Sequence, residues 1–495
     1  MLVLISDLHL TDASCGVSLP TGAVDVFVSR LNECALQASW RADGRYKPVE
    51  RIDLVLLGDI LDTTRSTRWH QTQIRPWDDP QSPAVVEAVG GIVDGILQHN
   101  SQSITSLRRL AADSAIRLPV ATQAGQPDYD SQPFSVAVRT QYMVGNHDWY
   151  LHLRGASYDL IRQKVSHHLG LANSHTAPFP HDPVECDELL GTLRRHRVLA
   201  RHGDIFDPLS FTEDRDTSSL SDAIIIELVN RFAGEVQQDL GNHLPDAVAV
   251  AIQEIDNIRP LLLIPVWLDG VLERCCHQPS IRKQIKKTWD RLADAFLQLN
   301  IVREHDSWSP FALVDGLESA LKFSKRLSIG WAAKTNSWLH SLRGSANDSY
   351  YQHALAEQDF RNRRARHIVY GHTHHAETVP LDASFADSFV LNQMYFNAGT
   401  WRRVYRPTIL APSQHEFIPA EAISLLSFFQ GDERGGRPFE TWSGTLGVGL
   451  NPAPVRGNTN VSIHAAQQST AAAKAPIAAP HFRSALSGRT TGTTT

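Results

Sequence analysis

The sequence predicts an α/β fold, because short apolar runs with the length of buried strands alternate with longer stretches of helical spacing. Residues 2–5 and 52–57 are runs rich in leucine, isoleucine and valine, and residues 23–38 between them repeat apolar side chains at helical intervals. Each apolar run leads into a loop with a carboxylate, at Asp7 and at Asp59. The chain therefore begins with a βαβ unit whose strands are followed by polar side chains.

The length of the chain predicts more than one structural part. With 495 residues it exceeds the usual size of one compact domain, yet the motifs described below extend over most of it. We expect one main domain, formed by residues 1–210 and 362–450 and interrupted by a helical insertion at residues 211–361. Residues 451–495 are rich in Ala, Thr, Ser, Gly and Pro, and predict a disordered tail because few apolar side chains offset its ordering entropy.

Composition excludes several classes of protein. The hydrophobic content of 42% and charged content of 20% are typical of a globular protein, and the net charge of −6 indicates no general nucleic-acid-binding surface. Residues 1–5 lack a basic leader, so we expect a buried strand rather than a signal peptide. No stretch is long and apolar enough to cross a membrane, and the five cysteines are too irregularly spaced for a disulfide framework. A cytoplasmic location is expected.

Five short motifs contain side chains that bind metal ions. They are Asp7-Leu8-His9, Gly58-Asp59-Ile60-Leu61-Asp62, Gly145-Asn146-His147-Asp148, His202-Gly203-Asp204 and Gly371-His372-Thr373-His374. Each one alone is explained equally well or better by a surface turn or a structural histidine. Together they supply the carboxylate, imidazole and amide ligands of a two-metal site.

The order of these motifs resembles the pattern of the calcineurin-like metallophosphoesterase superfamily. That pattern is Asp-x-His, Gly-Asp-x-x-Asp, Gly-Asn-His-Asp or Glu, a later His, and Gly-His-x-His, and every ligand position is occupied here. The resemblance covers about residues 1–62, 140–207 and 365–405, and does not extend to the insertion or the tail. It implies a four-layered α/β/β/α sandwich.

The resemblance also implies two divalent metal ions with one shared carboxylate ligand, Asp59. The first ion would be held by Asp7, His9, Asp59 and His374, and the second by Asp59, Asn146, His202 and His372. The mixture of oxygen and nitrogen ligands favours Mn, Fe or Zn over Mg.

The reaction implied by the resemblance is hydrolysis of a phosphoester. A hydroxide that bridges the metals would attack phosphorus, while His147 assists the leaving group and Asp62 orients His147. Imidazole suits this role because its proton is mobile near pH 7. The expected substrate is a small-molecule phosphodiester, a monoester or a nucleotide diphosphate.

Three arginines are expected to contact this substrate: Arg65, Arg68 and Arg402. Arg65 and Arg68 closely follow Asp62, where a solvated loop is an equally good explanation, and Arg402 follows a run that resembles a loop of the superfamily.

Within the superfamily the chain is similar to the branch containing UDP-2,3-diacylglucosamine pyrophosphatase. That branch has Arg where this chain has His147, and a far shorter insertion.

Two alternative functions stay open. Some DNA-repair nucleases share these five motifs, and a local basic groove would suit nucleic acid, although the acidic balance of the chain argues against this alternative. A non-catalytic scaffold on the same fold would be marked by the loss of ligands, and none is lost. The sequence indicates no particular oligomeric state.

Overall fold

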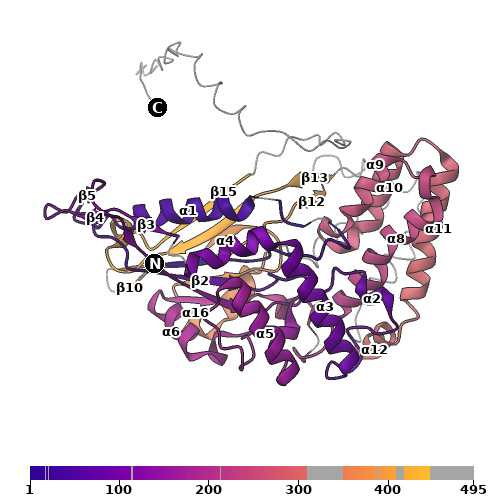
Figure 1. Cartoon of the computed structure of the whole chain (residues 1–495), viewed down its shortest axis with the longest axis horizontal. Coiled ribbons are helices and arrows are strands. Elements are labelled where there is room, and N and C mark those ends of the chain that lie inside the picture. Colours follow the sequence, from indigo (N-terminus) through magenta and orange to yellow (C-terminus); the bar gives the residue numbers. More distant parts are fainter. Residues whose placement is uncertain are drawn as a thin grey trace, which may run out of the picture. The chain divides into compact units, whose positions relative to one another are not determined.

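The computed structural model describes residues 1–16, 18–20, 22–112, 115–211, 213–308, 349–386, 389–407 and 417–445. Within them the chain has a mixed α/β fold, as the sequence predicts (Figure 1). The expected tail, residues 451–495, lies outside the described residues, and so do residues 309–348 of the expected insertion. No helix in the described part of the chain is long and apolar enough to cross a bilayer.

The larger sheet has the strand order β15-β14-β1-β2-β7. Its strands are β1 (Leu2–Ile5), β2 (Arg51–Leu57), β7 (Ala137–Met143), β14 (Ile423–Phe428) and β15 (Phe439–Gly444). Strands β1, β2 and β7 are parallel, whereas β14 is antiparallel to β1. The predicted strands at residues 2–5 and 52–57 are therefore confirmed, and so is the helix between them, α1 (Ala23–Ala38).

The smaller sheet has the order β10-β11-β9-β8. Its strands are β8 (Val198–Ala200), β9 (His367–Tyr370), β10 (Glu377–Ala386) and β11 (Phe389–Asn397). Strands β8, β9 and β11 are parallel, so their carboxyl ends share one edge of the sheet. Short strands also pair as β3 (Arg117–Leu118) with β6 (Phe134–Ser135), β4 (Val120–Ala121) with β5 (Pro127–Asp128), and β12 (Val404–Pro407) with β13 (Phe417–Ala420).

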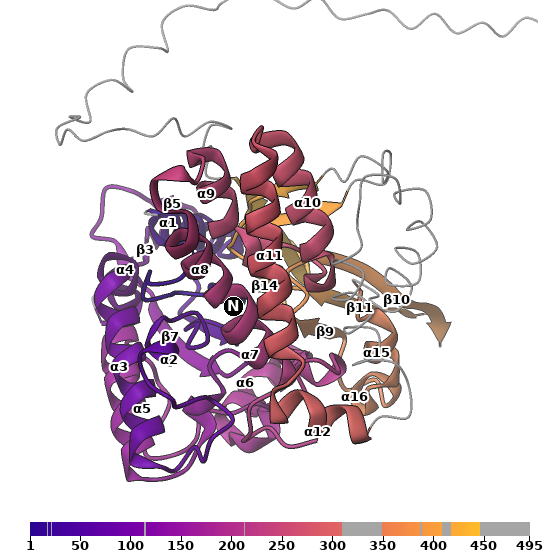
Figure 2. The same ribbon diagram turned by 90° about the vertical axis from the view of Figure 1, so that its right-hand side faces the viewer.

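The two sheets share an apolar cluster. Alternate residues of β1 point to opposite faces of the sheet, so Leu4 joins this shared cluster with Val369 and Phe396, whereas Val3 and Ile5 pack on the other side. That other side is covered by α1, α3 (Pro83–His99), α4 (Ser101–Ala112) and α5 (Ala156–Leu169). Beyond the smaller sheet lie α15 (Tyr351–Ala356) and α16 (Gln358–Arg361), and Figure 2 shows the strands between these two sets of helices.

Residues 220–308, which we call the helical segment, have an apolar core of their own. The segment contains α7 (Leu220–Ala223), a π-helix at Ile224–Asn230, α8 (Arg231–Leu240), α9 (Asp246–Gln253), α10 (Ile264–Cys275), α11 (Pro279–Phe296) and α12 (Asn300–Trp308). Phe232, Ile252, Trp267 and Trp289 are buried in this core, where the rings of Phe232 and Trp289 contact each other. Figure 1 shows α8, α9, α10 and α11 grouped together on the right of the view.

Candidate metal centre

The metal-ligand motifs all follow the carboxyl ends of parallel strands. Asp7 and His9 come after β1, Asp59 after β2, Asn146 after β7, His202 after β8, and His372 and His374 after β9. Because parallel strands end at a common edge, and the two sheets pack against each other, these loops converge. The structure brings all seven predicted ligands together.

Asp7, His9 and His374 form the first half of the centre. The Nε2 atoms of His9 and His374 face each other at 2.9 Å, and Asp7 Oδ1 lies 3.3 Å from His374 Nε2 and 3.7 Å from His9 Nε2. Ligand atoms about 2.1 Å from one cation lie about 3.0–3.4 Å apart in octahedral or tetrahedral geometry. The three side chains therefore have the spacing of a metal site.

Asp59, Asn146, His202 and His372 form the second half. Asp59 Oδ2 lies 3.1 Å from His202 Nε2, and Asn146 Oδ1 lies 3.0 Å from His372 Nδ1. Asp59 Oδ2 also lies 3.8 Å from His9 Nε2, so this carboxylate stands between the two halves. This is the position that a bridging ligand requires.

Two buried polar atoms in the centre have charged neighbours but no hydrogen bond. Asp7 Oδ1 and His202 Nε2 make no hydrogen bond within the described residues, although both residues are fully buried. An unsatisfied buried polar atom costs about 1–3 kcal/mol. A divalent cation in each half would satisfy these atoms, so the residues present fit such ions.

Three of the four histidines are oriented by a hydrogen bond from the ring nitrogen that faces away from the centre. This arrangement fixes the tautomer and leaves the other nitrogen free to bind a metal. The pairs are His9 Nδ1 with Asp62 Oδ2 at 2.9 Å, His202 Nδ1 with the Leu57 carbonyl at 2.9 Å, and His372 Nε2 with Asp207 Oδ2 at 3.0 Å. Asp207, which the sequence analysis missed, therefore positions a ligand.

Five of the seven ligand residues have a left-handed backbone conformation. The φ angles are 55° at Asp7, 48° at His9, 52° at Asp59, 66° at His372 and 57° at His374. Such angles are uncommon outside glycine and persist only where the surrounding structure enforces them. Five such angles in one place indicate that the surrounding structure enforces an unfavourable backbone conformation. This conformation directs the ligand side chains towards the centre.

Glycines in the motifs make room for the ligands. Gly58 has φ +84°, and a Cβ atom there would lie 2.5 Å from His202 Nδ1. A Cβ atom at Gly145 would overlap Asp59 Oδ1. Glycine is thus required where the backbone of one loop passes a ligand from another.

His147 lies beside the ligands and is held by Asp62, as the sequence predicts. Its Nδ1 is 2.9 Å from Asp62 Oδ1, and its Nε2 is 3.9 Å from Asp59 Oδ2. Burial disfavours the protonated ring, but the neighbouring carboxylates of Asp62 and Asp59 outweigh burial and raise the pKa of His147 to about 10. In this surrounding His147 carries a proton that it can donate.

Asp148 is a further residue of the site whose role the sequence analysis missed. Its carboxylate accepts hydrogen bonds from the Ile60 amide at 2.9 Å, the Gly145 amide at 2.6 Å and the Tyr142 hydroxyl at 2.6 Å. These bonds tie the loop after β2 to the loop after β7. Asp148 is the fourth residue of the Gly-Asn-His-Asp motif, and this position is the sequence signal that could have identified its role.

The helical segment contributes charged residues next to the centre. Asp256 Oδ2 lies 2.7 Å from Arg402 Nη2 and 3.4 Å from Arg65 Nε, and all three side chains are buried. Burial raises the pKa of Asp256, but these arginines outweigh it and hold the pKa far below its usual range. Arg259 Nη2 lies 3.0 Å from Nδ1 of the ligand His374. No motif in the sequence marked Asp256 or Arg259.

The three predicted substrate arginines have different surroundings. Arg402 reaches the centre, with Nη1 3.7 Å from Asp62 Oδ2, and Arg65 is joined to it through Asp256. Arg68 lies in the short helix α2 (Arg68–Gln71), and its guanidinium is directed towards Gly91 of α3. The structure thus brings Arg402 to the centre, places Arg65 next to it through Asp256, and directs Arg68 away.

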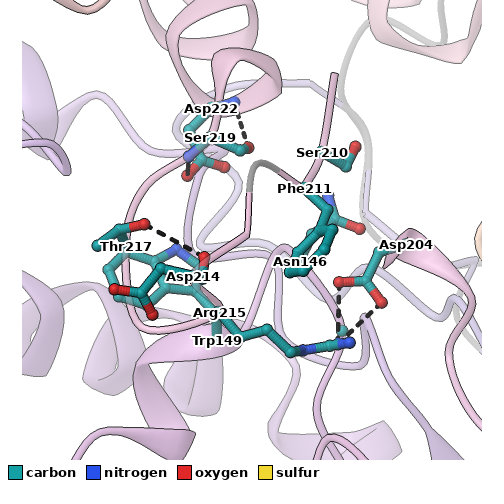
Figure 3. A pocket seen from close by; sticks show the side chains of 11 residues that line it. Asn146, Trp149, Asp204, Ser210, Phe211, Asp214, Arg215, Thr217, Ser219 and Asp222 are labelled. Atoms are coloured by element: carbon teal, nitrogen blue, oxygen red, sulfur yellow. Dashed lines mark hydrogen bonds and ion pairs between the residues drawn. The ribbon is translucent and has the colours of Figure 1, made fainter. Parts of the chain in front are cut away.

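A pocket opens beside Asn146 (Figure 3). Trp149 and Phe211 contribute apolar wall, and Arg215 crosses the pocket to Asp204, with Nη2 2.9 Å from Oδ1 and 3.0 Å from Oδ2. The pocket therefore combines aromatic and charged side chains next to Asn146.

Comparison of the chain with models of protein families and with curated proteins finds no match.

Proposed function

We propose that this protein is a two-metal phosphoester hydrolase. The proposal rests on one observation: seven side chains from five strand-end loops converge with the spacing of metal ligands, and two of their buried atoms lack hydrogen bonds. Divalent cations bound to such a set would acidify a water molecule and neutralise charge on a phosphoryl group. The ligand set suits Mn, Fe or Zn.

The chain's own residues would serve this reaction in distinct ways. Asp62 accepts hydrogen bonds from both His9 and His147, so it fixes the ring of a metal ligand and the ring of a proton donor. His147, held by Asp62 beside the centre, would donate a proton to the leaving oxygen. Burial of the centre excludes bulk water and strengthens these interactions.

We also propose membership of the calcineurin-like metallophosphoesterase superfamily, with its four-layered α/β/β/α architecture. The order of the five motifs supports this assignment, and so does the packing of two sheets through one shared cluster with helices on their outer faces. The helical segment would act as a cap, since Asp256 and Arg259 reach the centre from it.

The substrate class that the site favours is a small-molecule phosphodiester, monoester or nucleotide diphosphate. Arg259 is partly exposed beside the first half of the centre. Its guanidinium would contact an anionic substrate.

A substrate panel tests the proposal. The full chain, stripped with a chelator and reconstituted with Mn, Fe or Zn, should hydrolyse bis-p-nitrophenyl phosphate, p-nitrophenyl phosphate or a nucleotide diphosphate, and should be inactive without metal. Single- and double-stranded DNA should stay intact. Efficient DNA cleavage would reassign the protein as a nuclease, and metal binding without hydrolysis of any substrate would favour a scaffold.

A further inference from the structure

A second group of metal-binding side chains lies outside the centre described above. It consists of His152 at the end of a 3-10 helix (Trp149–His152), His181 before another 3-10 helix (Pro183–Glu185), and Asp216 in the loop that precedes α7. One potential ligand atom from each of the three lies within 4.8 Å of the other two. Three loops that are distant in sequence thus converge on one point.

His181 carries the clearest sign that a ligand is required. The residue is only 2% exposed, yet neither of its ring nitrogens has a hydrogen-bond partner among the residues that the structure describes. Burying an imidazole without partners costs free energy, and buried polar groups in proteins are normally satisfied. A cation bound to one ring nitrogen would remove this cost.

His152 is oriented as a metal ligand would be. Its Nδ1 donates a hydrogen bond to the Phe179 carbonyl at 2.8 Å, so Nε2 keeps its lone pair. Nε2 lies 3.7 Å from Asp216 Oδ1. Two ligand atoms of a tetrahedral zinc site, each about 2.0–2.1 Å from the ion, lie about 3.4 Å apart. The observed distance therefore requires only a small adjustment.

The charges around this group are compatible with a cation. Asp216 carries a negative charge, and Glu185 Oε2 lies 3.8 Å from His152 Nδ1. Arg215 is adjacent in sequence, but its guanidinium is bound by both oxygens of Asp204 (Figure 3). The positive charge of Arg215 is thus balanced by the carboxylate of Asp204.

We propose that His152, His181 and Asp216 bind one zinc-type divalent ion, separate from the two-metal centre. Two imidazoles and one carboxylate are a ligand set typical of zinc, with a fourth position left for water. The loop at residues 213–219 leads into the helical segment. The ion would join this loop to His152, which follows the ligand motif after β7, and to His181, which precedes the 3-10 helix Pro183–Glu185.

This site would have a consequence for the pocket beside Asn146. Asp214, Arg215 and Thr217 of the same loop line that pocket (Figure 3). An ion on Asp216 would hold this wall in place, because Asp214 Oδ1 already accepts a hydrogen bond from the Asp216 amide at 2.9 Å.

Zinc stoichiometry tests the proposal without relying on catalysis. The full chain is dialysed to equilibrium against micromolar zinc, and bound metal is measured by mass spectrometry for wild type and for Asp216→Asn. The variant should bind one equivalent fewer than wild type, whatever number the main centre holds. Its half-exposed side chain makes this variant safe for folding.

Three further single substitutions and two double variants complete the test. Glu213→Gln, an equal change of charge at an exposed position of the same loop, should bind as much zinc as wild type. His152→Gln should lose the same equivalent, and the double variant with Asp216→Asn should lose no more. Asp59→Asn should keep one equivalent that Asp216→Asn then removes, which separates this site from the proposed catalytic one. Equal zinc content in wild type and Asp216→Asn would overturn the proposal and leave a metal-free histidine pair.

Discussion

The strand-end loops and the helical segment both reach the metal centre, but they do so in opposite ways. The loops supply all seven ligands from the ends of two packed sheets, with strained φ angles and close glycine contacts. The helical segment has its own apolar core and reaches the centre through few residues, chiefly Asp256 and Arg259. The loops therefore have one enforced geometry. The segment contacts the main part of the chain through charged groups, through buried hydrogen bonds such as that of Asn230 to the Thr64 carbonyl, and through Ile226, which packs in the core of the larger sheet.

Under the proposed function, this difference assigns the chemistry to the strand-end loops and the choice of substrate to the helical segment. A two-metal centre needs ligand positions accurate to a fraction of an ångström, which sheet ends provide. A cap needs only to place a few charged or apolar groups near the substrate. Changes in the loops should therefore abolish activity, and changes in the segment should alter stability or substrate affinity.

Replacement of the shared carboxylate should have the largest effect. Asp59→Asn removes the negative charge between the two halves of the centre, so we expect metal to be lost and kcat/KM to fall by about ten-thousandfold or more, equivalent to over 5 kcal/mol. Metal analysis measures the loss of metal, and a phosphodiester assay measures the fall in kcat/KM. Asp43→Asn, at an exposed turn, is the control. Full metal content in Asp59→Asn would refute the bridging role.

Loss of the proton donor should separate catalysis from metal binding. His147→Ala should keep its metal, because no ligand is removed, while kcat falls by about a hundred- to a thousandfold. The loss should be smaller for substrates with a good leaving group such as p-nitrophenol. His168→Ala, an exposed histidine of α5, should be unaffected. Unchanged kcat in His147→Ala, with a poor leaving group, would contradict this assignment.

The buried charges between loops and segment should govern stability more than chemistry. Asp256→Asn leaves Arg65 and Arg402 buried without their shared carboxylate, and breaking such a group costs about 3–5 kcal/mol. Urea unfolding of the metal-free protein measures this. Asp246→Asn, exposed at the start of α9, is the matched control. If both variants unfold at the same urea concentration, the buried contact does not hold the segment to the loops.

Arg259 should affect substrate affinity. When His374 binds a metal through Nε2, its Nδ1 carries the proton and no longer accepts from Arg259, so the guanidinium becomes available to an anionic substrate. Arg259→Gln should then raise KM about tenfold or somewhat more, as expected for one charge-assisted hydrogen bond, and change kcat little. Arg274→Gln, exposed on α10, is the control. A fall in kcat at constant KM would instead make Arg259 part of the catalytic centre.

The difference between the strand-end loops and the helical segment explains which site residues the sequence could predict. Ligands such as Asp7 and His374 were found because left-handed backbone and close packing force glycine, aspartate and histidine into short local patterns. Asp207 and Asp256 were missed because their partners are distant in sequence: Asp207 contacts His372, and Asp256 contacts Arg65 and Arg402. A single aspartate with such partners has no local sequence pattern. Arg68 looked equivalent to Arg65 in sequence, but a short helix turns it towards α3.

The smallest effect should come from matched core substitutions, one in each region. Ile252→Val in the core of the helical segment and Ile52→Val in β2 each remove one buried methylene, at a cost of about 0.5–1.5 kcal/mol. If the two cores unfold as separate cooperative units, Ile252→Val should speed amide hydrogen exchange in α8 and α9 alone, and Ile52→Val should speed it in the larger sheet alone. Mass spectrometry of the exchanged protein measures this. Equal acceleration in both regions by either variant would show that the contacts between them join them into one cooperative unit. The loops and the segment would then differ in their proposed chemical roles but not in their stability.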